Sequence, residues 1–286
     1  MRSVREKYSC VLMLLALALL LAALPARAGS RLTATGGAGS IEGSAGGGLI
    51  PWAVLTGTAS DTETGAGVGM SHAWLDDYQL HTLSAAVTIN NRLELSVARQ
   101  ILSLDTLGLD SLQLDIFGLK ARLWGDLVYS RSGQFSAGVQ YKTLEDDALP
   151  LALGARQGHG VDAYLSHSKL WLGAAAGYNL LSSVSLRATR ANQLGLLGFG
   201  GPKNEAYHAV WEGALALMPN AHWALGMEYR QKPDQLNGLP EDDAKDLFVA
   251  WFPQKHVTAT LAWLDMGRIA GLDRQQGVYA ALQLAF

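Results

Sequence analysis

The chain ends with "GVYAALQLAF" (residues 277–286), and this stretch decides the fold class. Apolar side chains occupy every second position, namely Val278, Ala280, Leu282, Leu284 and Phe286. Such a spacing is typical of a β-strand with two different faces. Terminal residues that pack against nothing usually fray. We therefore expect the final strand to be paired along its length, as the last strand of a closed barrel must be.

Similar alternating segments follow one another along the chain after residue 60. The clearest of them run through Leu83–Ile89, Leu93–Val97, Phe117–Leu123, Phe135–Tyr141 and Leu247–Trp251. There are about twelve, with lengths near the roughly 9–11 residues that a tilted strand needs to cross a bilayer. The sequence thus predicts an all-β fold, a transmembrane antiparallel up-and-down β-barrel of about 12 strands, with 14 as the alternative.

Alternation alone does not tell which face is wet, because a soluble sandwich or a lipocalin-like barrel alternates as well. Here the polar stripes are rich in Gly, Ala, Ser and Thr and carry charges of both signs, which suits a crowded lumen. The residues expected to line the lumen are Arg92, Glu94, Lys120, Arg122, Glu212, Glu228 and Arg230.

Aromatic residues near the expected strand ends favour a membrane barrel, in which such residues form two interfacial girdles. They are Trp74, Tyr78, Trp124, Tyr129, Trp211, Trp223, Tyr229, Trp251 and Trp263, with Trp211 and Trp223 expected to be neighbours across one turn.

The connections between the expected strands alternate between short and long. Short turns are predicted at Asn90, Gly125-Asp126, Leu181-Ser182, Met218–Asn220 and Pro253–Lys255, and long loops at 101–110, 143–160, 192–205, 232–244 and 265–276. Bacterial outer-membrane barrels have short periplasmic turns and longer outer loops.

The N-terminus has the features of a secretory signal peptide. Three basic residues precede a 14-residue apolar run, Val11–Leu24, and small residues close the segment at Ala26 and Ala28. Cleavage after residue 28 would remove the chain's one cysteine, Cys10, and leave 18 basic and 24 acidic residues. We expect a protein of the Gram-negative outer membrane, without disulfides and without the basic surface that nucleic-acid binding requires.

The segment between the signal peptide and the first clear strand does not fit the strand pattern. Residues 29–48 are rich in glycine, and Pro51 interrupts the more apolar stretch 49–58. The expected organisation is a signal peptide (1–28), an N-terminal segment (29–60) that is a leader, a plug or a first strand, and a barrel (61–286). The glycines lack the GxxxxGK[ST] pattern of a phosphate-binding loop.

Four stretches resemble a family of proteobacterial exported proteins of unknown function: "ATGGAGSIEGSAGGGLIPW" (34–52), "LRATRANQLGLLGFGG" (186–201), "MEYRQKPDQL" (227–236) and "DDAKDLFVAWFPQKHV" (242–257). The resemblance extends over nearly the whole mature chain and implies an outer-membrane barrel. It implies no substrate, reaction or functional residue.

The C-terminal strand also resembles the signal that the outer-membrane assembly machinery recognises in bacterial barrels. The residues expected to form it are Tyr279, Leu282, Leu284 and Phe286. The expected partners are therefore this machinery, membrane lipid and lipopolysaccharide. Oligomeric state is not predicted.

A search for catalytic chemistry yields weak candidates only. The "HDSNG" stretch of barrel phospholipases is absent, and His167 between Ser166 and Ser168 would point away from both in a strand. An omptin-like site would need one of the acidic pairs Asp76-Asp77, Asp146-Asp147 or Asp242-Asp243 with His72, His81 or His159. His222 and His256 are expected beside short turns. We predict no enzyme activity, no catalytic residue, no metal site and no cofactor.

Two hypotheses for function remain open. In the first, the protein is a passive, porin-like channel for small solutes, with the lumenal charges forming a constriction. In the second, it is a narrow or plugged barrel with a structural or binding role in the envelope. An outer-membrane hydrolase is a third and weaker hypothesis.

Overall fold

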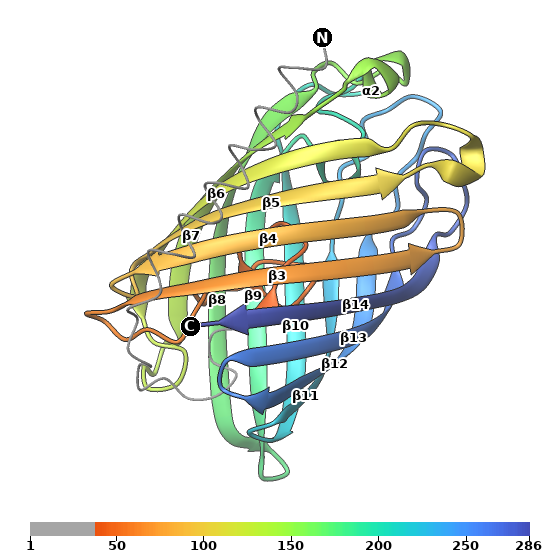
Figure 1. Ribbon diagram of the computed structural model, residues 1–286. Helices are drawn as coiled ribbons and strands as arrows, with labels where there is room; N and C mark the ends of the chain where they lie inside the picture. The colour runs from red at the N-terminus through yellow and green to blue at the C-terminus, as the bar shows by residue number, and fades with distance from the viewer. Residues whose placement is uncertain (1–37) are drawn as a thin grey trace.

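A computed structural model describes residues 38–286 (Figure 1). The expected signal peptide and residues 29–37 lie outside the described residues. Twelve antiparallel strands form a closed barrel. They are β3 (Thr64–Leu75), β4 (Gln79–Ile89), β5 (Leu93–Ser103), β6 (Leu112–Gly125), β7 (Gln134–Leu144), β8 (His159–Ala175), β9 (Tyr178–Thr189), β10 (His208–Asn220), β11 (Trp223–Arg230), β12 (Ala244–Gln254), β13 (Val257–Asp265) and β14 (Gln276–Ala285).

Each barrel strand pairs with its neighbours in sequence, and β14 closes the barrel against β3. The last residue completes this closure: the Phe286 N–H donates to the Ala66 carbonyl at 2.7 Å, and the Phe286 carbonyl accepts from the N–H groups of Ala66 and Thr58. The prediction of a twelve-stranded up-and-down barrel is confirmed. Stretch 49–58 does not contribute a barrel strand.

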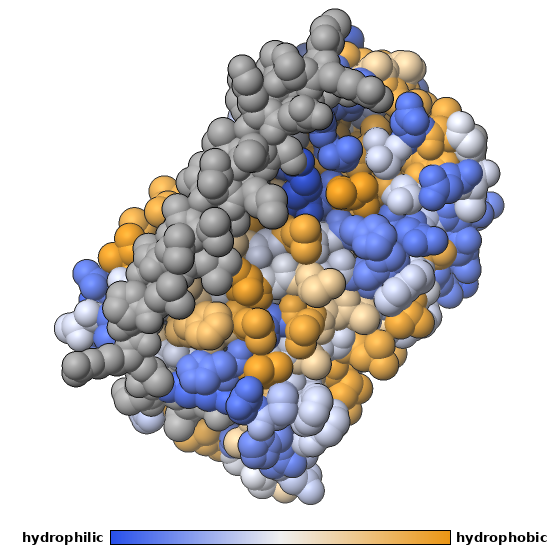
Figure 2. Space-filling view, in the orientation of Figure 1, coloured by the Kyte–Doolittle hydropathy of each residue, from blue (hydrophilic) through white to orange (hydrophobic). Residues whose placement is uncertain are grey.

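The apolar stripes face outward, as predicted. Leu83, Leu282 and Met70 are 63%, 45% and 59% exposed, whereas Arg187 and Glu228 on the opposite face are buried. The view in Figure 2 shows hydrophobic residues spread over the barrel wall. An apolar belt of this kind is stable against lipid and would be costly in water.

The long connections meet at one end of the barrel and most short turns at the other (Figure 1). The loop between β7 and β8 contains a short helix, α2 (Ala148–Ala152), and two 3₁₀ turns, η1 (Asp105–Leu107) and η2 (Asn192–Gly195), lie in other long loops. No helix in residues 38–286 is long and apolar enough to cross a membrane.

Two predicted short turns differ from the structure. The chain leaves β6 at Gly125 as predicted, but the connection to β7 is the longer loop 126–133. The second turn is misplaced. Leu181 and Ser182 lie inside β9, and the chain reverses earlier, at Ala176 and Gly177, which both have positive φ. The turn comes earlier in the sequence than predicted, because Ala176 and Gly177 adopt the left-handed conformation of a tight turn, whereas Ser182 and Ser183 pair within the sheet.

Exposed aromatic residues occur near both ends of the wall. Trp223 stacks on Trp251 beside the short turns, with a centroid distance of 6.0 Å, while Trp74 and Trp211 lie toward the long loops. Trp211 and Trp223 are therefore not neighbours across a turn, because β10 spans the wall between them. Tyr78 is also not a girdle residue: it is buried, and its hydroxyl donates to the Ile269 carbonyl.

Candidate functional site in the barrel lumen

The N-terminal segment lies inside the barrel, where Figure 1 shows it as the orange-red stretch behind the front strands. Every residue from Ser40 to Ala59 is buried. Two short strands, β1 (Ala38–Gly39) and β2 (Ala45–Gly46), pair with each other and make a compact hairpin. We call residues 38–59 the lumenal segment.

Glycine is required where the lumenal segment folds tightly. A Cβ on Gly46 would lie 2.1 Å from the Ile50 carbonyl oxygen, and one on Gly47 would lie 2.1 Å from the Glu228 carboxylate. Gly43 has a φ of 88°, in the left-handed region that glycine adopts readily. The glycine content that prevents a membrane strand thus allows the chain to fold within a narrow lumen.

Glu94 on β5 binds two backbone N–H groups of the lumenal segment. Its carboxylate accepts from Ala45 at 3.3 Å and from Thr56 at 2.7 Å. Lys120, opposite on β6, lies 3.3 Å from this carboxylate and donates to the carbonyl groups of Ala45 and Trp52. One buried ion pair of the wall therefore holds both Ala45 in β2 and the later stretch 52–56 of the lumenal segment.

Glu228 on β11 binds the bend of the lumenal segment in a similar way. Its carboxylate accepts from the Leu49 N–H at 2.6 Å and from the Trp52 indole N–H at 2.9 Å. A second acid, Asp246 on β12, accepts from the Glu228 backbone N–H at 3.1 Å. The Glu228 carboxyl group thus fixes the bend through one backbone donor and one side-chain donor.

Uncharged wall residues bind the rest of the segment. The Ala53 carbonyl accepts from the Gln134 amide at 2.6 Å and from the Ser136 hydroxyl at 2.5 Å, and the Ala53 N–H donates to the Ser168 hydroxyl at 2.9 Å. The Ser185 hydroxyl donates to the Pro51 carbonyl. The small polar residues of the inward stripes therefore bind the backbone polar groups of Pro51 and Ala53.

The lumenal segment contributes one carboxylate of its own, Glu42, to a cluster of cations. The Glu42 carboxylate accepts from Lys142 at 2.5 Å, from Arg230 at 2.8 Å and from Arg187 at 3.1 Å. Burial alone would raise the pKa of Glu42. The charges of Arg187, Arg230 and Lys142 outweigh burial and hold the pKa well below the ordinary value, so Glu42 is ionised.

Two wall acids balance the rest of this cluster. Glu212 lies 2.7 Å from the Arg187 Nε and 3.2 Å from the Arg230 Nε, and Asp162 lies 2.7 Å from the Lys142 ammonium. Five consecutive strands, β7 to β11, thus contribute one charged residue each. With Glu42 in place, three cations face three carboxylates.

The structure brings five of the seven predicted lumen residues into the interior: Glu94, Lys120, Glu212, Glu228 and Arg230 are all buried. Arg122 lies near the short-turn end, where its guanidinium donates to the Gly125 carbonyl. Arg92 does not line the lumen. It is exposed in the turn between β4 and β5, since the inward stripe of β5 begins after it.

Several interior residues were not among the predicted site residues: Glu42, Asp162, Arg187 and Asp246 are buried in the lumen, as is Lys142. The alternation in 159–170 places Asp162 on the inward stripe and would have identified it. Glu42 had no such signal, because no periodicity marks its glycine-rich surroundings.

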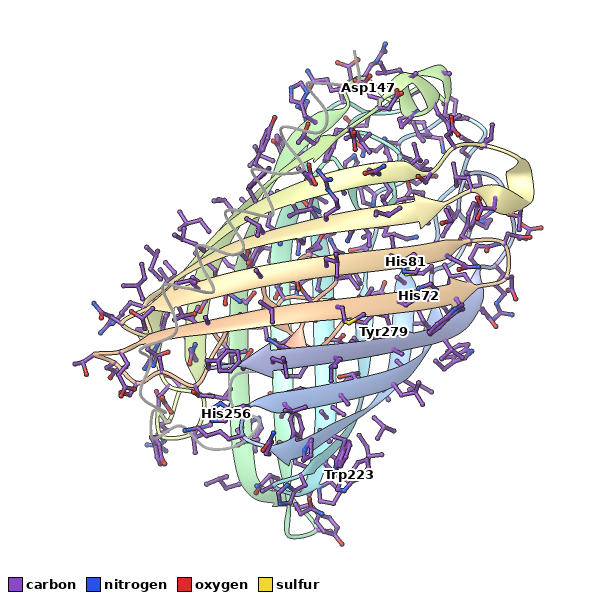
Figure 3. The ribbon with its side chains drawn as sticks, in the orientation of Figure 1. His72, His81, Asp147, Trp223, His256 and Tyr279 are labelled. Atoms are coloured by element: carbon purple, nitrogen blue, oxygen red, sulfur yellow. The ribbon has the colours of Figure 1, made fainter. Side chains whose placement is uncertain are left out.

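The four residues of the expected assembly signal divide between the two faces. Leu282, Leu284 and Phe286 are exposed on the outer face. Tyr279 is buried and points into the barrel, where its ring approaches Gly48 (Figure 3). The Phe286 ring stacks on His256.

The long loops close over the outer end of the lumen. Lys232 donates to the Gln193 side-chain oxygen at 2.9 Å and to the Met266 carbonyl at 2.7 Å, and the Gln193 N–H donates to the Glu241 carboxylate at 3.0 Å. Burial lowers the pKa of Lys232 to about 8 and raises the pKa of Glu241 to about 7. We call these loop residues the Gln193 cap.

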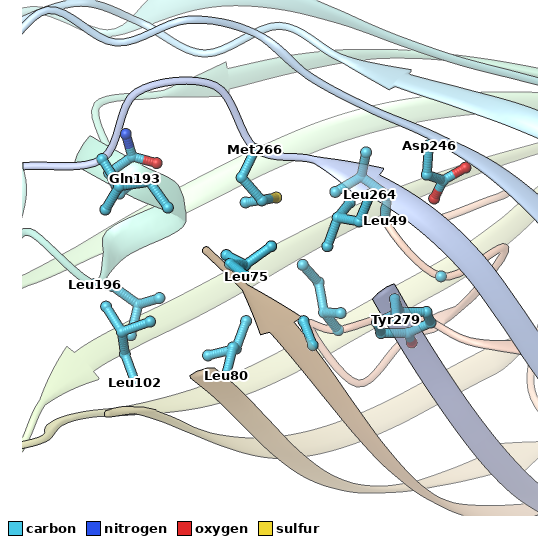
Figure 4. Close-up of a pocket in the computed structure, with 14 residues that line it drawn as sticks. Leu49, Leu75, Leu80, Leu102, Gln193, Leu196, Asp246, Leu264, Met266 and Tyr279 are labelled. Atoms are coloured by element: carbon cyan, nitrogen blue, oxygen red, sulfur yellow. The ribbon is translucent and has the colours of Figure 1, made fainter. Parts of the chain in front are cut away.

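A small cavity lies between the Gln193 cap and the lumenal segment (Figure 4). Its volume is about 30 Å³, close to the share of one water molecule. Mostly apolar side chains line it, among them Leu49, Leu80, Leu264 and Met266. The space left between segment and cap is therefore too small for a solute.

The catalytic candidates are not assembled into a site. Ser166 and Ser168 point into the barrel, whereas His167 lies on the outer side and contacts the Ser132 carbonyl at 2.8 Å. His72 and His81 form a pair on the outer wall, far from Asp147 beside α2 (Figure 3).

The remaining candidates have structural partners. Asp242 binds Arg268, Asp77 accepts from Gln275, and His159 is exposed at the start of β8. His222 and His256 bind backbone carbonyl groups at the short turns. Within residues 38–286, no three His, Cys, Asp or Glu side chains lie together in a way that could hold a metal ion.

Comparison with solved structures finds outer-membrane barrels. A KdgM porin in complex with disordered oligogalacturonate has 10% identity and a TM-score of 0.50, with 77% of this chain and 99% of that chain covered. The outer membrane protein Omp33 of Acinetobacter baumannii has 8% identity and a TM-score of 0.46, with 79% and 100% covered. The outer membrane phospholipase A from Escherichia coli has 10% identity and a TM-score of 0.40, with 77% and 92% covered.

At these identities the likeness concerns the fold alone, a transmembrane barrel of the outer-membrane type. A search of curated proteins found no match. A family model described as "Protein of unknown function (DUF3034)" matches residues 35–283, which is most of the chain. The chain belongs to this family.

Proposed function

We propose that the protein is a porin-like channel of the bacterial outer membrane for small solutes, and that the lumenal segment closes its pore in the state described here. One observation carries the proposal: a segment of about twenty residues fills a charged, hydrogen-bonding lumen that would otherwise be open. The solved barrels of similar fold include porins, which supports the channel hypothesis as an analogy of fold.

The hydrogen bonds between the wall and the lumenal segment are of a kind that allows the segment to leave the lumen. The contacts of the segment with Glu94, Glu228, Ser168 and Gln134 are mostly hydrogen bonds to backbone groups, which water can replace. Leu49, Ile50 and Trp52 of the segment are buried in the apolar part of the interior, and the loss of this burial is the main cost that displacement must offset.

Localisation and partners follow from the same proposal. The exposed apolar wall requires lipid around the barrel, and lipopolysaccharide is expected around its outer end. Assembly requires the outer-membrane machinery, which we propose recognises β14. We propose no enzyme activity, since the serine and histidine candidates lie on opposite faces of β8.

Planar-bilayer conductance tests the proposal. The full mature chain is compared with a variant that lacks residues 38–56 and keeps Gly57 and Thr58, because the Thr58 N–H binds the Phe286 carbonyl. Heat-modifiable mobility in detergent gels verifies that both barrels are folded. We expect little current from the full chain and a stable ohmic current from the deletion variant.

A second arm keeps the chain length unchanged. Glu94→Gln together with Glu228→Gln replaces one of the two acceptor oxygens of each carboxyl group by a donor and so weakens the hydrogen bonds to the lumenal segment. We expect brief openings in place of a stable current. Glu205→Gln, which changes an exposed ion pair with Arg156, serves as the matched control and should behave as the full chain.

The alternative function, a closed barrel with a structural or binding role in the envelope, is favoured by the charge balance of the filled lumen. It predicts that the folded deletion variant also carries no current, because the Gln193 cap and the inward side chains would still obstruct the lumen. That result would overturn the channel proposal.

A further inference from the structure

The Glu42 carboxylate occupies a place that the barrel wall has built for a carboxylate. All its charged partners belong to the wall: Lys142 on β7, Arg187 on β9 and Arg230 on β11. The wall orients Lys142 and Arg187 without help from the lumenal segment. Arg230 also donates to the Leu49 carbonyl of that segment at 3.2 Å, but the wall residue Glu212 holds its Nε independently. The site is thus separable from the residue that fills it.

Glu212 orients the guanidinium groups of Arg187 and Arg230 through the Nε atom of each. Its Oε1 atom lies 2.7 Å from the Arg187 Nε and 3.2 Å from the Arg230 Nε. The Nη2 atoms of both arginines donate to Glu42, at 3.1 and 2.8 Å, and that of Arg187 also donates to the Glu212 Oε2 at the longer distance of 3.4 Å. Two arginines held side by side in this way bind a planar carboxylate between them.

Further wall contacts hold Arg187 in place. Its Nη1 donates to the Gln140 side-chain oxygen at 2.8 Å and to Asp162 at 3.2 Å, and its guanidinium lies over the Tyr164 ring at 5.0 Å. The Lys142 ammonium is held by Asp162 at 2.7 Å and by the Leu194 carbonyl. The three donors are thus preorganised, which reduces the cost of binding a ligand.

Departure of Glu42 would leave three cations facing two carboxylates, Asp162 and Glu212. An uncompensated buried cation is costly, so the site would take up another anion. We propose that Lys142, Arg187 and Arg230 form a binding site for a small organic carboxylate, and that Glu42 occupies this site as an internal substitute for that ligand. The proposal rests on the channel function, since a solute reaches the site when the segment moves.

Chemical rescue tests the site without any measurement of current. Glu42→Ala keeps Cβ and removes a methylene and a carboxylate, which together have the size and charge of acetate. We expect the folded variant to unfold at a lower temperature than the full mature chain. Acetate should raise that temperature in a saturable way, by on the order of 5 °C at about a hundredfold excess over its dissociation constant.

Three comparisons make the result specific. Acetamide, which has the shape of acetate without its charge, should leave the unfolding temperature of Glu42→Ala unchanged, and so should chloride at equal ionic strength. The full chain should not respond to acetate, because Glu42 fills the site. Glu205→Ala, which removes an exposed carboxylate paired with Arg156, should not respond either.

Equal effects of acetate and acetamide, or no effect of acetate on Glu42→Ala, would overturn the proposal. Should this variant fail to fold, the barrel that lacks residues 38–56 presents the same vacant cations, and absence of acetate stabilisation there would overturn it as well. A channel that conducts but ignores acetate contradicts this inference alone. Acetate rescue without any conductance contradicts the channel function and leaves the binding site standing.

Discussion

At the scale of the residue, buried charge determines how the interior is organised. Glu42, Glu94 and Glu228 each bind the lumenal segment or its surroundings through contacts that apolar residues could not make. Sequence alternation identified Glu94 and Glu228 as inward-facing. It could not identify Glu42, because the lumenal segment has no repeating pattern. The position of Glu42 depends on three cations that lie far away in the sequence, on β7, β9 and β11.

The Gln193 cap should depend on pH through Glu241 and Lys232. The pKa of Glu241 is about 7 when the cap is closed and near the ordinary value of 4.5 when it is open. The contribution of Glu241 to the stability of the closed cap is therefore highest below pH 4.5 and is lost as the pH rises through 7. The pKa of Lys232 is about 8 when closed and near 10.5 when open, so stability is regained between pH 8 and 10.5. We expect the least stable cap between pH 7 and 8.

Hydrogen-exchange protection of the Gln193 amide, corrected for the intrinsic exchange rate at each pH, measures this dependence, because that amide donates to Glu241. The variant Glu241→Gln should no longer show the decrease in protection up to pH 7, which Glu241 causes. It should keep the increase above pH 8, which Lys232 causes. Protection that is constant from pH 5 to pH 9 in the full chain would contradict the argument.

At the scale of the element, the strands follow from sequence and the exceptions have local causes. Alternation predicted the barrel strands, and the composition of the polar stripes together with the aromatic residues and the loop lengths predicted the outward face. It misplaced the turn at Leu181-Ser182, since polar Ser182 and Ser183 inside β9 resemble turn residues. It left the role of 29–60 open, because a segment held by backbone hydrogen bonds carries no periodic side-chain pattern.

Phe286, the residue that follows β14, gives a prediction for the closure of this strand against β3. Deleting Phe286 removes its backbone hydrogen bonds to Ala66 and Thr58, at a cost of about 3 kcal/mol in the free energy of unfolding. Phe286→Ala keeps these bonds and removes only the ring. Both variants should reach the outer membrane in smaller amounts if the ring is part of the assembly signal, and only the deletion should also lower the unfolding temperature strongly.

Quantitative immunoblots of membrane fractions and thermal unfolding of the refolded barrels separate the two effects. Normal membrane levels of the deletion variant would show that assembly does not need Phe286, and an unchanged unfolding temperature would show that closure does not need it.

At the scale of the whole molecule, the barrel encloses a segment of its own chain. The apolar wall could be predicted from the sequence as a unit, since one period describes all twelve strands. The filled interior could not, because it results from the meeting of residues 38–59 with strands that lie up to about two hundred positions away. The charge balance of the lumen also exists only in the folded molecule.

Thiol accessibility in intact outer membranes tests the central claim, that the lumenal segment lies inside the barrel. Cysteine is introduced in a chain with Cys10→Ser, once as Ser44→Cys and once as Ser111→Cys, which is exposed before β6. Both changes are close to isosteric. We predict that a charged, water-soluble thiol reagent modifies Ser111→Cys readily and Ser44→Cys roughly 100-fold more slowly. Equal rates at the two positions would contradict the account.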